Sequence, residues 1–106
     1  MTKYKNKITV VDGIKFHSKK ESYRYLVLKD REKRGEITDL KLQVPFILAP
    51  SVIINSRKVP ALRYFADFTY IENGQLIIND VKGLLTNVYK IKRHIMKVLG
   101  YDILET

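Results

Sequence analysis

The stretch Leu62–Gly83, which reads LRYFADFTYIENGQLIINDVKG, decides the fold. Two runs rich in aromatic and β-branched residues flank the pair Asn73-Gly74. This pair best supports the positive φ angles of a two-residue type I′ turn. The pattern therefore predicts a β-hairpin that has these two residues as its loop.

The register of this hairpin follows by counting outward from the loop until Asp67 faces Asp80. Directly opposed residues share one face of a sheet, with Cβ atoms about 4.5 to 5.5 Å apart. Lys82, two residues beyond Asp80, lies on that face too. The sequence thus predicts that two carboxylates and a lysine converge.

Opposed carboxylates destabilise a strand pair unless they share a proton or bind a cation. Mg²⁺ meets this need because it binds a few carboxylates and keeps several of its waters. Two plainer interpretations stay open: one aspartate lies at a strand end in water, or Lys82 pairs with one of them.

The chain has 106 residues, which fit one domain spanning 1–106. A hydrophobic fraction of 45% indicates a folded globule. No cysteine is present, which excludes disulfides and thiolate metal sites and favours an intracellular setting. No apolar run approaches the ~20 residues that cross a bilayer, so we expect a cytoplasmic protein without a membrane partner.

Twenty Lys and Arg against eleven Asp and Glu give a net charge of +9, which favours nucleic acid as the partner over a merely basic solvated surface.

The N-terminal part is expected to contain a small hairpin and the first helix. Residues 3–7 are basic and expected to fray, and residues 8–17 flank the turn signal Asp12-Gly13. Ser18-Lys19-Lys20-Glu21 fits a capping box, so a helix is expected from there to about Arg34, with Gly35 as its stop. Glu21 can then accept the backbone N–H of Ser18, or it can lie above the site. Its helical stripe with Tyr25 and Leu28 competes with a second apolar patch at Tyr23, Leu26 and Val27, and the sequence leaves open which one meets the sheet.

The middle of the chain alternates apolar and other residues from Leu40 to Leu48, which predicts a strand. Pro45 lacks a donor and indicates an edge position or a bulge. Residues 52–54 are compatible with a short strand, and residues 55–58 with a basic turn that reaches a phosphate backbone or is simply solvated.

A second helix is expected from about Thr86 to Leu99, ended by Gly100, and a short last strand over residues 101–105. We expect this helix to bury the stripe Val88, Ile91, Ile95 and Leu99. Lys92 lies at the border of the apolar face, where it can point towards a site or snorkel into water.

The order of these elements carries a resemblance. Glu21 lies in the first helix, Asp67 in the second strand of the core, and Asp80-Val81-Lys82 in the third, with a basic helix directly after. This resembles the PD-(D/E)xK nuclease superfamily, which includes restriction endonucleases, Holliday-junction resolvases and transposon end-cleaving endonucleases. The segments DGIKFHSKKESYRYLVLK, YFADFTY and DVKG are most similar to a family of small phage-borne proteins of unknown function assigned to that superfamily.

The resemblance covers nearly the whole chain and implies an α/β (α+β) fold with a restriction-endonuclease-like αβββαβ core, in which two helices flank a mixed sheet. It implies that Asp67, Asp80 and the carbonyl of Val81 bind Mg²⁺ or Mn²⁺, with Glu21 as a direct or water-mediated ligand, and that Lys82 orients or activates the attacking water. Ala66 stands where the motif has proline, which weakens the motif match more than the chemistry.

The expected function is a metal-dependent DNA endonuclease, selective for branched or junction DNA, acting in phage DNA processing in a bacterial host. Lys92 is expected to support developing charge. The cations expected to hold the DNA backbone are Lys58, Arg63, Lys90, Arg93 and Lys97. A homodimer that cuts both strands follows by analogy with resolvases. The alternative is a non-catalytic nucleic-acid-binding module, although opposed carboxylates would repel its ligand.

Overall fold

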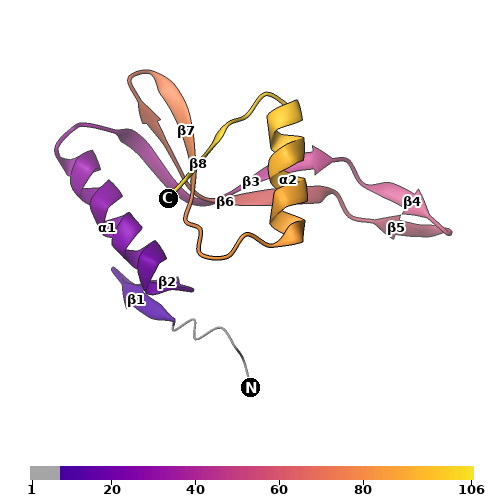
Figure 1. The fold of residues 1–106 in the computed structure, drawn as a ribbon, viewed down its shortest axis with the longest axis horizontal. Helices are drawn as coiled ribbons and strands as arrows, with labels where there is room; N and C mark the ends of the chain where they lie inside the picture. Colours follow the sequence, from indigo (N-terminus) through magenta and orange to yellow (C-terminus); the bar gives the residue numbers. More distant parts are fainter. Residues whose placement is uncertain (1–7) are drawn as a thin grey trace.

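The computed structural model describes residues 8–106, so the expectation for residues 3–7 lies outside the described part of the chain. A hairpin of β1 (Thr9–Val11) and β2 (Ile14–Phe16) precedes helix α1 (Lys19–Lys33) (Figure 1). The strands β3 (Thr38–Ala49), β4 (Val52–Ile54), β5 (Arg57–Val59), β6 (Leu62–Glu72) and β7 (Gln75–Asp80) follow, and α2 (Asn87–Val98) and β8 (Ile103–Glu105) complete the chain.

The central sheet has the strand order β3-β6-β7-β8. The β3–β6 and β6–β7 pairs are antiparallel, whereas β8 runs parallel to β7. A parallel neighbour needs a crossover connection, and α2 supplies it. The predicted mixed α+β fold, with two helices and a small N-terminal hairpin, is therefore confirmed.

The β6–β7 hairpin has the predicted turn and register. Asn73 and Gly74 take φ angles of 51° and 75°, as a type I′ turn requires. Glu72 pairs with Gln75, and the recorded pairing continues to Phe68 and Asn79. The next position outward on each strand is Asp67 and Asp80.

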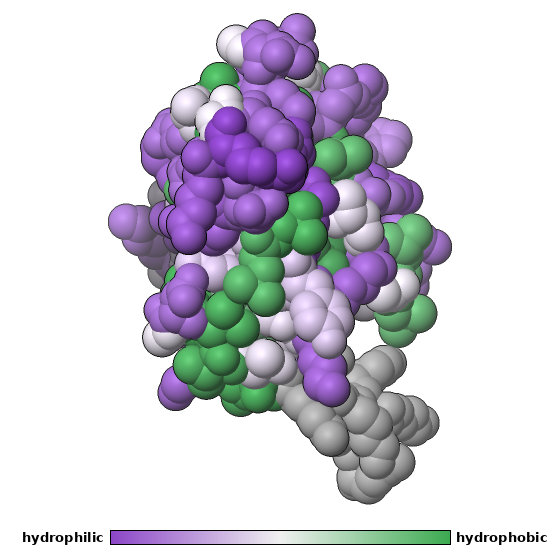
Figure 2. All heavy atoms as spheres, turned by 90° about the vertical axis from the view of Figure 1, so that its left-hand side faces the viewer, coloured by the Kyte–Doolittle hydropathy of each residue, from purple (hydrophilic) through white to green (hydrophobic). Residues whose placement is uncertain are grey.

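Helix α1 begins as its sequence predicts and ends beside Gly35. The Ser18 hydroxyl accepts the backbone N–H of Glu21, which makes Ser18 the N-cap. The expected second half of the capping box is wrong, because the Glu21 carboxylate accepts the N–H of His17 rather than that of Ser18. The helix turns one stripe inward, Glu21, Tyr25 and Leu28, and leaves the other exposed, Tyr23, Leu26 and Val27. Figure 2 views the molecule from the side on which α1 lies and shows a band of apolar side chains among hydrophilic ones.

Two hydrophobic clusters join the helices to the sheet. One contains Tyr25 and Leu28 of α1 with Phe68 and Tyr70 of β6, and Ile77 packs against it. The other contains Tyr89 and Met96 of α2 with Tyr64, Ala66 and Ile78. Since consecutive residues of a strand point to opposite faces, Ile77 and Ile78 place the two helices on opposite faces of β7.

Strand β6 serves both clusters with side chains of the same parity, Tyr64 and Ala66 for α2 and Phe68 for α1. The side chains of β6 pass from the α2 cluster to the α1 cluster at Asp67, which lies between Ala66 and Phe68. Across the sheet on β3, Gln43 has a φ of 51°, which interrupts the regular pleat at this level. Asp67 consequently lies where the two cores meet.

The predicted buried stripe of α2 is wrong. Tyr89 and Met96 are the buried residues of this helix, whereas Val88, Ile91 and Leu99 are about half exposed or more. The hydrophobic pattern indicates which residues of the helix are apolar, but it does not identify the surface that the helix meets, which here is the cluster of Tyr64, Ala66 and Ile78 around Tyr89 and Met96. Of the predicted stripe only Ile95 is partly buried, and the other three members face away from the sheet.

Residues 52–59 form a second hairpin, β4–β5, that projects from the end of β3 and β6 (Figure 1). The short strand at residues 52–54 is confirmed, whereas β5 was not predicted and takes up the expected basic turn only in part. All six strand residues of this arm are exposed. Pro45 lies on β3, which is an edge strand as expected.

Candidate active site

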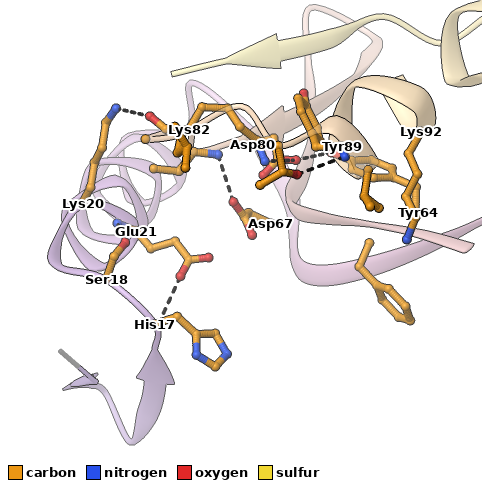
Figure 3. Close-up of a pocket in the computed structure, with 16 residues that line it drawn as sticks. His17, Ser18, Lys20, Glu21, Tyr64, Asp67, Asp80, Lys82, Tyr89 and Lys92 are labelled. Atoms are coloured by element: carbon orange, nitrogen blue, oxygen red, sulfur yellow. Dashed lines mark hydrogen bonds and ion pairs between the residues drawn. The ribbon is translucent and has the colours of Figure 1, made fainter. Parts of the chain in front are cut away.

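A cleft of about 970 Å³ lies between the start of α1, the ends of β6 and β7, and the start of α2 (Figure 3). The predicted residues Glu21, Asp67, Asp80, Lys82 and Lys92 all line it, and so does Val81. The structure thus brings together every residue that was expected to take part in catalysis or metal binding.

Asp67 and Asp80 form the floor of this cleft as a coupled carboxylate pair. Burial, followed by the hydrogen bond with Asp67, raises the pKa of Asp80 to about 7. Burial also raises the pKa of Asp67. Two neighbouring buried carboxylates resist being ionised together, which favours a proton on Asp80 although the Lys82 ammonium lowers its pKa.

Several donors fix the two carboxylates. Asp67 accepts the backbone N–H of Val81 at 2.9 Å on Oδ2 and the Gln43 amide at 3.1 Å on Oδ1. Asp80 is only 3% exposed and accepts the Tyr64 hydroxyl at 2.6 Å on Oδ2. Burial and this bond raise the pKa of Tyr64 well above its ordinary value, so its hydroxyl remains a donor.

Lys82 lies beside the pair. Its Nζ is 3.3 Å from Asp80 Oδ2 and 3.6 Å from the centroid of the Tyr89 ring. The backbone around it is held because Lys82 N–H donates to the carbonyl of Thr106, and Thr106 N–H donates to that of Asp80. An ammonium held between a carboxylate and an aromatic face has a defined position.

Glu21 reaches the same cluster from α1. Its Oε1 accepts the His17 N–H at 3.1 Å, and its interaction with Asp67 contributes to the raised pKa of that carboxyl. The side chain therefore both stabilises the entry to α1 and faces the carboxylate pair. The predicted bond to the Ser18 N–H is thus replaced by one to the His17 N–H, and the carboxylate still faces Asp67.

Within residues 8–106, no three His, Asp or Glu side chains form a ready-made metal centre. The donor chemistry nevertheless fits Mg²⁺, which is commonly held by one or two carboxylates together with waters. Asp67 and Asp80 could supply those carboxylates, and a bound cation would relieve their mutual repulsion.

The cations predicted to hold DNA are spread over the molecule. Lys58 lies on the β4–β5 arm, while Arg63 and Lys90 are exposed on β6 and α2. Arg93 forms an ion pair with Glu105, and Lys97 forms one with Asp102, at a separate hollow lined by parts of α2 and residues 101–103. The first three are thus better placed than the last two to meet a polyanion.

Sequence reasoning missed four side chains that shape the cleft: Lys20, Gln43, Tyr64 and Tyr89. Lys20 donates to the carbonyl of Lys82 at 2.6 Å. A tyrosine in an apolar strand is a weak hint of a buried hydroxyl partner, and nothing in the pattern identifies Asp80 as that partner. Gln43 donates its amide to Asp67 from a left-handed backbone position, and nothing in the alternating pattern of its strand indicates either feature.

No helix in residues 8–106 has the length and apolar character needed to cross a membrane. No curated protein and no solved structure matches the chain. One family model, described as a protein of unknown function (DUF1064), matches residues 1–104. This match covers nearly the entire sequence, and the chain therefore belongs to the DUF1064 family.

Proposed function

We propose that this protein is a metal-dependent endonuclease that hydrolyses phosphodiester bonds in DNA, with branched or junction DNA as the preferred substrate and phage DNA processing as its setting. One observation carries the proposal: the coupled carboxylates Asp67 and Asp80 lie beside the ammonium of Lys82 on the floor of an open cleft. A protein that only binds nucleic acid gains nothing from two buried acids that face its phosphates.

The carboxylates Asp67 and Asp80, with the carbonyl of Val81 and with Glu21 directly or through water, would hold Mg²⁺ or Mn²⁺. When bound, the cation supplies a water of lowered pKa and positive charge beside the phosphoryl oxygen. Cation binding displaces the proton favoured on Asp80, so affinity for the metal rises with pH.

The protein's own residues position the reacting groups. Gln43 and the Val81 N–H each donate to one oxygen of Asp67, and the Tyr64 hydroxyl donates to Oδ2 of Asp80, so both carboxylates are fixed in orientation. The Lys82 ammonium stabilises negative charge on the phosphate and orients the attacking water. Lys92 lines the same cleft from α2 and adds charge where the leaving oxygen departs.

Cleavage assays test the proposal directly. A four-way junction, a flapped duplex and a linear duplex are incubated with Mg²⁺, Mn²⁺ or EDTA and the wild-type protein, Asp80→Ala or Lys82→Ala. We expect metal-dependent cutting that both substitutions abolish, while the fold and most DNA binding persist. Asp102→Ala removes an exposed acid outside the cleft and is the matched control.

Two outcomes contradict the proposal. Binding of all substrates without cutting indicates a binding module. Cutting by Asp80→Ala at the wild-type rate removes the proposed site.

The homodimer remains part of the proposal, because two copies related by a two-fold axis can cut both strands of a branched substrate. The exposed aliphatic stripe of α2 supports it: Ile91 is 60% exposed and Leu99 49%. Sedimentation of the wild type and of Ile91→Glu tests the idea. We expect a dimer that the glutamate dissociates, and a monomeric wild type contradicts it.

A further inference from the structure

The active-site cleft has an apolar rim that phosphate binding does not require. Phe65, Leu84 and Val88 all line the cleft, and they are 51%, 64% and 63% exposed. A groove that holds only a sugar-phosphate backbone is favoured by cations and hydrogen-bond donors. These three side chains therefore favour a ligand that has an apolar part.

Phe65 is the exposed one of the four phenylalanines. The other phenylalanines, Phe16, Phe46 and Phe68, are buried or partly buried. The ring of Phe65 stacks on no other ring within residues 8–106, and Pro45, its partner across the β3–β6 pair, is exposed as well. One face of a rigid aromatic side chain is thus open to a ligand.

The position of Phe65 suits a nucleobase. Phe65 precedes Asp67 by two residues on β6, which separates their Cα atoms by roughly 7 Å. Because alternate residues of a strand point to the same face, Phe65 and Asp67 are on one side of β6, so a base on Phe65 belongs to a nucleotide next to the phosphate at the carboxylates. Lys20 and Lys92 line the cleft beside it and attract the flanking phosphates.

We propose, resting on the nuclease function, that Phe65 stacks on an unpaired nucleobase next to the scissile phosphate, with Leu84 and Val88 completing the apolar rim. The bases of a continuous duplex are covered by their neighbours and do not offer a free face. Single-stranded nucleotides do, and aromatic side chains bind them without sequence preference. The substrate class is therefore DNA with single-stranded nucleotides at the cleavage point, as at a flap or a branch.

Binding assays in EDTA test this inference without cleavage. Fluorescence anisotropy gives the Kd of a short single strand, a flapped duplex and a linear duplex for the wild type, Phe65→Ala and Phe65→Tyr. We expect Phe65→Ala to weaken binding of the single strand and the flap by about fivefold or more, the effect of losing one stacked base. Binding of the linear duplex is unchanged, and Phe65→Tyr binds like the wild type.

Tyr23→Ala is the matched control, because Tyr23 is an exposed aromatic residue on α1 outside the cleft. Leu84→Ser tests the same rim independently, should Phe65→Ala lower the melting temperature. Equal weakening for all three substrates, or none, overturns the inference. The nuclease proposal is judged separately by Lys82→Ala, so normal stacking without cleavage and cleavage without stacking are distinct results.

Discussion

The ring of Tyr89 lies beneath the ammonium of Lys82, 3.6 Å from its centroid, and its hydroxyl donates to Glu105. The cation–π contact and the hydroxyl bond can be separated by substitution. Tyr89→Phe keeps the ring, so we expect cleavage close to the wild-type rate. Tyr89→Leu removes an attraction of about 0.5 to 2 kcal/mol and should slow single-turnover cleavage roughly 2- to 30-fold.

Circular dichroism of both Tyr89 variants controls for folding. If Tyr89→Phe is as slow as Tyr89→Leu, the hydroxyl bond to Glu105 positions the site and the ring does not.

The proton favoured on Asp80 makes a prediction about pH. The pKa of Asp80 is about 7 in the folded protein, against an ordinary value of 3.8. Between these values the folded state binds more protons than the unfolded state, so the free energy of unfolding decreases as pH rises from about 4 to about 7. Removing the negative charge should abolish most of this decrease.

Thermal melting in EDTA across this pH range, with wild type and Asp80→Asn, measures the effect. We expect the melting temperature of the wild type to fall with pH and that of Asp80→Asn to fall less, so that the variant is the more stable one above neutral pH. A wild type whose stability increases towards pH 7 contradicts the coupled pair.

At the scale of elements, the β4–β5 arm is separable from the two cores. Its strand residues are all exposed and belong to neither hydrophobic cluster. Ala49 already pairs with Leu62, so replacing residues 50–61 by Asn-Gly closes the β3–β6 hairpin with a short turn. We expect the urea midpoint to stay near that of the wild type and DNA affinity to fall, because Arg57 and Lys58 are lost.

A large drop in the urea midpoint would show that the arm stabilises the fold. Arg57→Ala with Lys58→Ala in the intact arm is the control for the charge effect, and it should reproduce most of the loss in DNA affinity.

The elements show what one sequence could predict. The β6–β7 register followed from Asn73-Gly74 because a two-residue turn leaves a single pairing, and this pairing placed Asp67 beside Asp80. The buried face of α2 did not follow, since a helical pattern states which side is apolar but not which surface awaits it. The bond from the Tyr64 hydroxyl to Asp80 did not follow either, because Tyr64 lies on β6 beyond its paired part with β7. A side-chain contact between residues so far apart in the sequence has no local signal.

Across the whole molecule, the net charge of +9 is unevenly available to a polyanion. Arg34, for example, pairs with Asp30 and Glu36, whereas Arg63 and Lys90 are exposed and take part in none of the recorded ion pairs of residues 8–106. A cation already neutralised by the protein releases few counterions from DNA. Only exposed cations such as Arg63 and Lys90, which no carboxylate neutralises, should therefore contribute fully to the salt dependence of DNA binding.

We expect log K for DNA binding to fall steeply with log salt, and Arg63→Ala or Lys90→Ala to reduce the slope by about 1 each. Arg34→Ala is the matched control and should leave the slope unchanged. Titrations of labelled duplex at several salt concentrations give these slopes. If Arg34→Ala changes the slope as much as Arg63→Ala does, a cation that already pairs with carboxylates also binds the DNA backbone. If neither Arg63→Ala nor Lys90→Ala reduces the slope, the DNA backbone does not contact these two residues and the prediction is wrong.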